Sequence, residues 1–153
     1  MALNEMLLDV WLQLCSIINN DRMVQLMPFN EAFVCNLLNR EREIHPSNYL
    51  TATDLCQKTG LFKSQMNTIL TSLEAKKLIC RVRSTQDKRK IFITLAAEED
   101  LQLYWQEHAQ IMQFVDALIE RVGENDIRYF IEILKKIISC ARDEMKQRSV
   151  YGN

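Results

Sequence analysis

The sequence has little of the glycine and proline that tight turns require, with three glycines and two prolines among 153 residues. Sandwiches and barrels of β-strands reverse direction often, and Gly and Pro supply many of those turns. Their scarcity argues against an all-β fold and favours a mostly helical one. With 48% apolar and 25% charged residues the composition is that of a globular protein, and we expect one domain over residues 1–153.

Cysteine and histidine are also too sparse for a recognisable metal site. The cysteines are odd in number and form no Cys-x-x-Cys pair, so neither a disulfide framework nor a four-ligand zinc site has support; they stand at positions 15, 35, 56, 80 and 140. A metal site built from His45, His108 and distant acids would require folding to bring them together. The sequence has no Gly-rich phosphate loop and no nucleophile motif. We therefore expect no metal, no cofactor and no enzymatic activity.

No segment reads as a signal peptide or as a membrane span. Basic residues are missing before Arg22, and the N-terminal apolar residues are interrupted by Asn4, Glu5, Asp9 and Gln13. A signal peptide begins with basic residues, and a membrane-spanning helix needs about 20 apolar residues. We expect a cytoplasmic protein with no membrane partner.

Helical periodicity marks both ends of the chain. Residues 3 to about 20 are predicted to form an amphipathic helix, because apolar residues recur at intervals of three and four: Leu3, Met6, Leu7, Val10, Trp11, Leu14, Ile17 and Ile18. Another helix is predicted to begin at the acidic residues 98–100, which favour the positive end of its dipole, and to end at Gly123. A last helix is predicted to open near Asn125 and Asp126 as capping residues.

These end helices, about 3–20 and 97–148, carry more apolar surface than a small central unit can cover. The surplus includes Leu14, Ile18, Ile131, Leu134 and Ile138. A homodimer would bury it, so we interpret them as dimerisation helices. The alternative is that these helices pack on one another within a single subunit.

Three short helices are predicted between residues 30 and 75. The first begins at Asn30 and has this apolar face: Phe33, Val34, Leu37 and Leu38. Thr51 and Asp54 have the spacing of a capping box, which satisfies free N–H groups at the start of the second helix, and Thr59-Gly60 ends it. The third has helical spacing at Met66, Ile69, Leu70 and Leu73.

From Leu78 onwards the period of the pattern changes to two. Isoleucine and arginine at 79, 81 and 83 alternate with Cys80 and Val82, and the run IFITL after Lys90 is rich in β-forming residues. Helix, turn, helix and hairpin in this order form a winged helix-turn-helix at about residues 30–96. The predicted fold class is therefore mainly α with a small β-hairpin wing.

Basic charge is concentrated in this central stretch. Residues 50–95 contain nine Lys and Arg against three acids, a net charge of +6, whereas the whole chain has −1. Seven of the nine bases lie between Lys76 and Lys90. A solvated hairpin is the simple alternative, but a basic loop beside a polar helix face suits phosphates and base edges. Double-stranded DNA is the favoured partner.

The run LEAKKLICRVRSTQDKRKIFITL resembles the MarR family of bacterial multiple-antibiotic-resistance regulators. In that family the recognition helix ends in a Leu-Glu pair, here Leu73-Glu74, and the wing carries Asp-x-Arg, here Asp87-Lys88-Arg89. The resemblance extends over almost the whole chain. It departs at Phe62, where a small capping residue is usual, at Lys77, where Gly is frequent, and at Ala96, where Thr is usual.

The resemblance assigns Arg89 to the DNA minor groove and Asp87 to its support through an ion pair. A narrow minor groove has an enhanced negative potential that attracts arginine. The other DNA-binding candidates are polar or basic residues of the recognition helix and wing: Lys63, Ser64, Gln65, Asn67, Thr68, Thr71, Arg81, Arg83, Ser84, Lys88 and Lys90. Each of them individually has a competing interpretation as a solvated side chain.

The resemblance implies a homodimeric transcriptional regulator that binds a pseudo-palindromic operator and is released by a small-molecule or oxidative signal. The competing function is a winged-helix module that contacts an acidic protein and does not bind DNA. Relatives in this family bind small aromatic acids. Met66 and Trp11 are candidates to line such a ligand pocket, and the competing interpretation is that each is a core residue. Cys15, in the run QLCSIIN, is placed like the sensor of the organic-hydroperoxide-sensing branch. That branch uses nearby tyrosines, and none precedes Tyr49, so a core cysteine is the competing interpretation.

Overall fold

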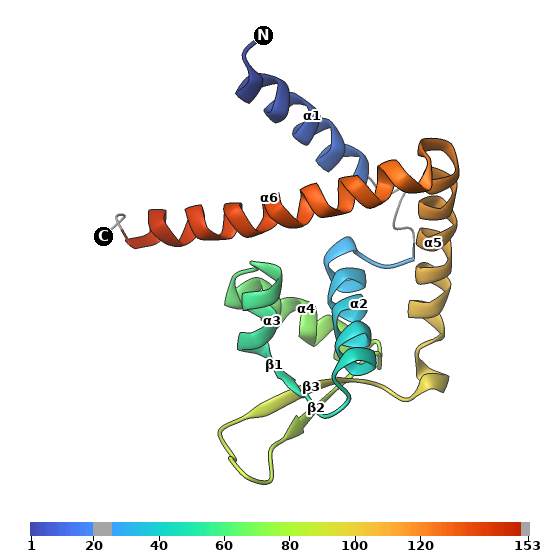
Figure 1. Ribbon diagram of the computed structural model, residues 1–153. Helices are drawn as coiled ribbons and strands as arrows, with labels where there is room; N and C mark the ends of the chain where they lie inside the picture. The colour runs from blue at the N-terminus through green and yellow to red at the C-terminus, as the bar shows by residue number, and fades with distance from the viewer. Residues whose placement is uncertain (20–25, 151–153) are drawn as a thin grey trace. The chain divides into compact units, whose positions relative to one another are not determined.

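The computed structural model describes residues 1–19 and 26–150, with side chains up to residue 148. The chain divides into two compact units, residues 1–111 and 112–153, and each is considered by itself. The first contains α1 (Leu3–Ile18), α2 (Phe29–Ile44), β1 (Leu50–Thr51), α3 (Ala52–Thr59), α4 (Lys63–Ala75), β2 (Ile79–Arg83), β3 (Ile91–Leu95), a 3-10 turn (Glu98–Asp100) and the start of α5 (Gln102–Val122). The second contains the rest of α5, and α6 (Glu124–Val150), as Figure 1 shows. The predicted mainly helical fold with a hairpin wing is confirmed, whereas the single domain stays a prediction.

The sheet has three antiparallel strands in the order β1-β3-β2. β2 and β3 pair over five residues, with Arg81 opposite Ile93, and form the predicted hairpin. β1 adds to the other edge of β3 with Leu50 opposite Ile93. The sequence pattern did not predict β1, because two residues are too few to show a period. Beyond Ile79 every residue of β2 is exposed, since the hairpin extends away from the helices (Figure 1).

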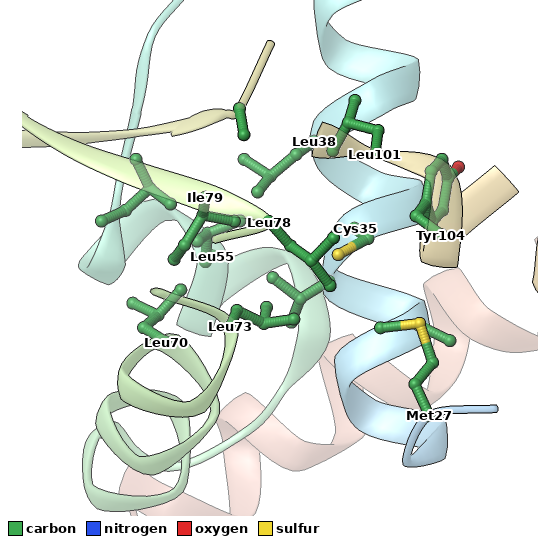
Figure 2. Packing of buried hydrophobic residues seen from close by; sticks show 14 of the residues in the cluster. Met27, Cys35, Leu38, Leu55, Leu70, Leu73, Leu78, Ile79, Leu101 and Tyr104 are labelled. Atoms are coloured by element: carbon green, nitrogen blue, oxygen red, sulfur yellow. The ribbon is translucent and has the colours of Figure 1, made fainter. Parts of the chain in front are cut away.

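One hydrophobic core joins α2, α3, α4 and the sheet with residues 96–104 (Figure 2). Met66, Leu70 and Leu73 lie one helical turn apart along α4, and all three are completely buried. Burial of one such side chain stabilises the fold by about 1.5–3 kcal/mol. Met66 is therefore a core residue, which is the interpretation that competed with its candidate role in lining a ligand pocket. The predicted apolar face of α4 is confirmed except that Ile69 is only half-buried.

The helix α2 begins at Phe29, one residue before the predicted start, and its buried face contains Val34, Cys35 and Leu38. The prediction that Phe33 belongs to this face is wrong, because its side chain is 38% exposed. The face follows positions 31, 34, 35 and 38, and residue 33 points away from this line. The Phe33 ring instead lies 6.3 Å from the ring of Phe29.

Local signals placed α3 correctly. The Thr51 Oγ1 accepts a hydrogen bond from the Asp54 backbone N at 3.3 Å, and the Asp54 carboxylate accepts one from the Thr51 backbone N at 2.8 Å. These reciprocal bonds are the predicted capping box. Gly60 ends the helix with φ of 76°, a left-handed conformation that glycine adopts without a steric penalty.

Two predicted helix starts need correction. The acidic residues 98–100 form a separate 3-10 turn and α5 begins only at Gln102, because Glu98 is bound elsewhere: its carboxylate accepts hydrogen bonds from Arg42 at 2.7 Å and from the indole N–H of Trp105 at 3.0 Å. In the second unit α6 begins at Glu124, so Asn125 and Asp126 lie within its first turn and do not precede it. Gly123, with φ of 104°, makes the sharp connection before it.

Candidate nucleic-acid interface

The exposed face of α4 is a continuous polar stripe. Ser64, Asn67, Thr68 and Thr71 follow one another at intervals of three, one and three residues, which places them on one side of the helix, and all four are exposed. The opposite side carries the buried Met66, Leu70 and Leu73 and fixes the rotation of the helix. Hydroxyl and amide groups on such a stripe can hydrogen-bond to base edges and phosphates.

The N-terminal end of α4 has an unusual cap. Phe62 occupies the N-cap position, and a phenyl ring cannot accept a hydrogen bond from the helix. The side-chain oxygen of Gln65 accepts a hydrogen bond from the Phe62 backbone N at 3.1 Å. Gln65 thus stabilises the start of its own helix, while Lys63 is exposed beside it.

The C-terminal end of α4 reverses through a left-handed residue. Lys77 has φ of 60°, its backbone N donates to the Glu74 carbonyl at 2.9 Å, and the Leu78 N donates to the Leu73 carbonyl at 2.9 Å. These two bonds form a Schellman motif, in which glycine is the usual left-handed residue. The next contact fixes the helix to α2, since the Lys76 ammonium pairs with the buried Glu31 carboxylate. The departure at Lys77 is thus a strained cap within an intact motif.

The wing loop between β2 and β3 is closed by its own hydrogen bonds. The Ser84 backbone N donates to the Lys90 carbonyl at 2.9 Å, and the Lys90 N donates to the Asp87 carbonyl at 2.9 Å. The Ser84 hydroxyl oxygen accepts from the backbone N of Gln86 and of Asp87, each at 3.2 Å. Ser84 therefore shapes the loop, in addition to being a candidate for DNA contact.

At the tip of the wing, Asp87 holds Arg89. The Arg89 backbone N and its guanidinium Nε donate to the same carboxylate oxygen at 3.1 and 3.2 Å. The backbone bond and then the side-chain bond from Arg89 hold the pKa of the Asp87 carboxyl below its usual range. The Arg89 side chain is 92% exposed, so its guanidinium is both oriented and accessible.

The other basic residues of the wing differ in the hydrogen bonds that their side chains make within the fold. Arg81 Nε on β2 donates at 3.0 Å to the carboxylate of Glu74, which lies in the last turn of α4. Arg83 donates to the Lys88 carbonyl at 2.6 Å and thereby connects β2 to the loop. Lys88 and Lys90 are exposed. The structure thus exposes the candidate DNA-binding residues of α4 and the wing except Ser84, which is half-buried. It also gives Gln65, Arg81, Arg83 and Ser84 bonding roles within the fold that the sequence did not predict.

Outside the winged unit, the candidate sensor residues lie on α1. Cys15 is half-buried and Trp11 is exposed, and α1 has no buried residue. Among the cysteines of the described residues, Cys35 is buried, and its burial followed by the charge of Glu31 raises the pKa of the thiol to about 12. Since the thiolate is the reactive form, this raised pKa disfavours reaction of the Cys35 thiol.

Within residues 1–19 and 26–150, no three His, Cys, Asp or Glu residues are arranged to hold a metal ion. No helix in the same ranges has the length and apolar character that crossing a membrane requires.

Comparison with known proteins gives one family. Residues 37–90 match the MarR family, and none of the curated proteins compared matches this chain. Among solved structures, the chain is similar to the PcaV transcriptional regulator from Streptomyces coelicolor in complex with its natural ligand, with 18% identity, coverage of 88% of this chain and 91% of that chain, and a TM-score of 0.67. It is similar to the transcriptional regulator BldR from Sulfolobus solfataricus, with 17% identity, coverage of 91% and 99%, and a TM-score of 0.68.

A third similar structure is a MarR-family transcriptional regulator from a Rhodococcus species, with 15% identity, coverage of 90% of this chain and 96% of that chain, and a TM-score of 0.71. At identities this low, the similarity establishes a shared fold alone. That fold extends over most of each chain. The match at residues 37–90 covers α4 and the wing loop. The resemblance read from the sequence is confirmed: residues 37–90 match the MarR family, and the chain has the fold of MarR-family transcriptional regulators.

Proposed function

We propose that this protein is a transcriptional regulator that binds duplex DNA as a homodimer and performs no catalysis. The observation that carries the proposal is that two exposed features occur within the same basic stretch, residues 50–95. One is the polar stripe of α4, and the other is the Arg89 guanidinium oriented by Asp87 at the wing tip. Residues 50–95 have a net charge of +6, which supplies the attraction to phosphate that most DNA binding requires.

The two features suit the two grooves of DNA. A recognition helix enters the major groove, where each base pair presents a distinct pattern of donors and acceptors to side chains such as Asn67. A narrow minor groove attracts arginine through its negative potential. Asp87 limits the motion of the Arg89 side chain in advance, so less conformational entropy is lost on binding.

A dimer is supported by the apolar surface of the end helices. The helix α1 has no buried residue, and no residue of α6 with a described side chain is buried. The exposed large apolar residues include Leu3, Leu7, Val10, Leu14, Ile17, Phe130, Ile131 and Ile138. Each of the two helices by itself exposes several large apolar side chains; monomeric proteins rarely expose large apolar patches, whereas an isologous dimer covers them. The dimer would present two recognition helices about 34 Å apart, one turn of DNA.

Release by a signal is the second part of the proposal, and α1 carries its candidate residues. The similar PcaV structure holds its natural ligand, which supports a small-molecule signal for this chain as well. Trp11, exposed on α1, is the remaining candidate for contact with an aromatic ligand.

If Cys15 is instead an oxidant sensor, cumene hydroperoxide will abolish operator binding by the wild type, a thiol reductant will restore it, and Cys15→Ser will stay bound throughout. Continued binding by the oxidised wild type would remove Cys15 as a sensor.

Salt dependence of duplex binding tests the DNA-binding function. The affinity of the protein for duplex DNA should fall steeply between 50 and 200 mM salt, because each neutralised phosphate releases counterions with a slope of about −0.9. Heparin and duplex-DNA columns should both retain the protein. Absence of retention on DNA, together with capture of an acidic protein, would favour the protein-binding module instead.

A further inference from the structure

Phe62 is a large apolar side chain exposed at the start of the recognition helix. Its side chain is 76% exposed, and it is the single exposed large hydrophobic residue in residues 50–78, all of which the structure describes. The neighbouring positions on α4 are polar or basic. An isolated phenyl ring on this surface gains nothing from the core of its own subunit.

The phenyl ring also does not serve the helix that it precedes. An N-cap residue normally accepts a hydrogen bond through Ser, Thr, Asp or Asn, and loss of that bond costs about 1 kcal/mol. The Phe62 side chain accepts none, and its backbone alone is bound: its N donates to the Gln65 side chain and its carbonyl accepts from the Met66 N at 2.9 Å. The residue thus forgoes helix stability and exposes apolar surface, and a contact outside the subunit would account for both.

The position of Phe62 identifies the chemistry of that contact. The N-terminal residues of a recognition helix approach base edges in the major groove. There the thymine 5-methyl group is the one apolar group presented by the bases, and phenylalanine is among the side chains that contact it. Lys63 follows directly and Ser64 begins the polar stripe, so the phenyl ring adjoins groups suited to phosphates and bases.

We propose that Phe62 is a specificity-determining residue that contacts the 5-methyl group of a thymine in each half-site. The inference rests on the proposed DNA-binding function and adds an apolar contact to the hydrogen bonds of the polar stripe. The methyl groups of Thr68 and Thr71 could make a similar contact, so substitutions at Phe62 itself are needed to assign it. Burial of one methyl group between ring and base contributes an affinity difference of about fourfold, which corresponds to about 0.8 kcal/mol.

Replacement of thymine by deoxyuridine, which lacks only the 5-methyl group, tests the inference. An operator is first selected from random duplexes with the wild-type protein, and each thymine is then replaced singly. We expect one position per half-site at which deoxyuridine weakens wild-type binding about fourfold. At that position Phe62→Ala should bind thymine and deoxyuridine equally, while Phe62→Leu should keep part of the difference.

Phe62→Asn separates recognition from folding. Asparagine is a good N-cap, so this variant should unfold at a higher temperature than the wild type while it loses the thymine preference. A thymine preference that survives in both Phe62→Ala and Phe62→Asn would overturn the inference. So would wild-type binding that is insensitive to deoxyuridine at every position, or a Phe62→Ala defect confined to dimerisation; in these cases DNA binding itself would stand. Failure of the wild type to bind any duplex would overturn the proposed function and this inference together.

Discussion

The Asp87 carboxylate receives two hydrogen bonds from Arg89, one from the backbone N at 3.1 Å and one from the guanidinium Nε at 3.2 Å. A single carboxylate oxygen therefore holds both the backbone and the guanidinium of a residue whose side chain is 92% exposed. Exposed ion pairs contribute little to folding stability, so this pair is better explained by orientation of the guanidinium than by stabilisation of the hairpin.

Replacement of Arg89 should weaken DNA binding without affecting the fold. We expect Arg89→Ala to lose about 1–3 kcal/mol of affinity for a selected operator, because a base-proximal contact is removed. Lys88→Ala, the matched control on the same loop, should lose less and lose it evenly across sequences. Fluorescence anisotropy with operator and scrambled duplexes measures both. Equal and negligible losses in the two variants would contradict the assignment of the wing.

Asp87 should increase the selectivity of the protein for its operator over other duplexes, and this effect should be the same throughout the neutral pH range. Its pKa is lowered in the folded protein, so the bond to Arg89 is fully present above the unfolded pKa of about 3.9 and is lost only as the pH falls through the lower folded value. Asp87→Asn should therefore reduce the ratio of operator to scrambled-duplex affinity by the same factor from about pH 5.5 to 8. A factor that changes with pH in this window would show that the Asp87 carboxylate is not the group responsible.

A glycine at position 77 should stabilise the protein. Lys77 holds φ of 60°, and the left-handed conformation costs a non-glycine residue about 1–2 kcal/mol. Glycine loses about 0.5–1 kcal/mol more conformational entropy on folding, so Lys77→Gly should raise the free energy of unfolding by about 0.5–1 kcal/mol net. Urea denaturation measures this change. Lys77→Ala keeps the strain and should show no such gain; an equal gain in both variants would refute the explanation.

Arg83 should act as a positioning residue. Its guanidinium donates to the Lys88 carbonyl at 2.6 Å, so Arg83→Gln should loosen the wing and weaken operator binding. The slope of log affinity against log salt should stay near the wild-type value, because no phosphate contact is lost. Lys88→Gln, which removes a candidate phosphate contact, should make this slope shallower by about 0.9. A similar change of slope in Arg83→Gln would identify Arg83 as a phosphate contact.

Features encoded by neighbouring residues could be predicted from the sequence. Thr51 and Asp54 are three positions apart, and Met66, Leu70 and Leu73 repeat at helical intervals, so the cap and the buried face both followed from local pattern. Asp87 and Arg89 were paired through the family resemblance, and their separation of two residues makes the contact a local one.

Contacts between residues that are far apart in the sequence could not be predicted, because only the folded chain brings them together. The Lys76–Glu31 pair joins residues 45 positions apart, and the hydrogen bond from the Leu26 backbone N to the buried Glu107 joins residues 81 positions apart. The start of α5 was misplaced for the same reason, because Glu98 is held by Arg42 from a distant helix. The exposure of Phe33 depends on the rotation of α2, which its partners in the core determine and which its own sequence leaves ambiguous.

The central claim, that two copies of this chain bind one duplex through their winged units, can be measured directly on the complex. Light scattering of the free protein should give about twice the 18.0 kDa mass of one chain, and the complex with a selected operator should contain two chains per duplex. Hydroxyl-radical footprinting should show two protected half-sites about one helical turn, or 34 Å, apart. A monomer at micromolar concentration that protects a single half-site or none would contradict the account.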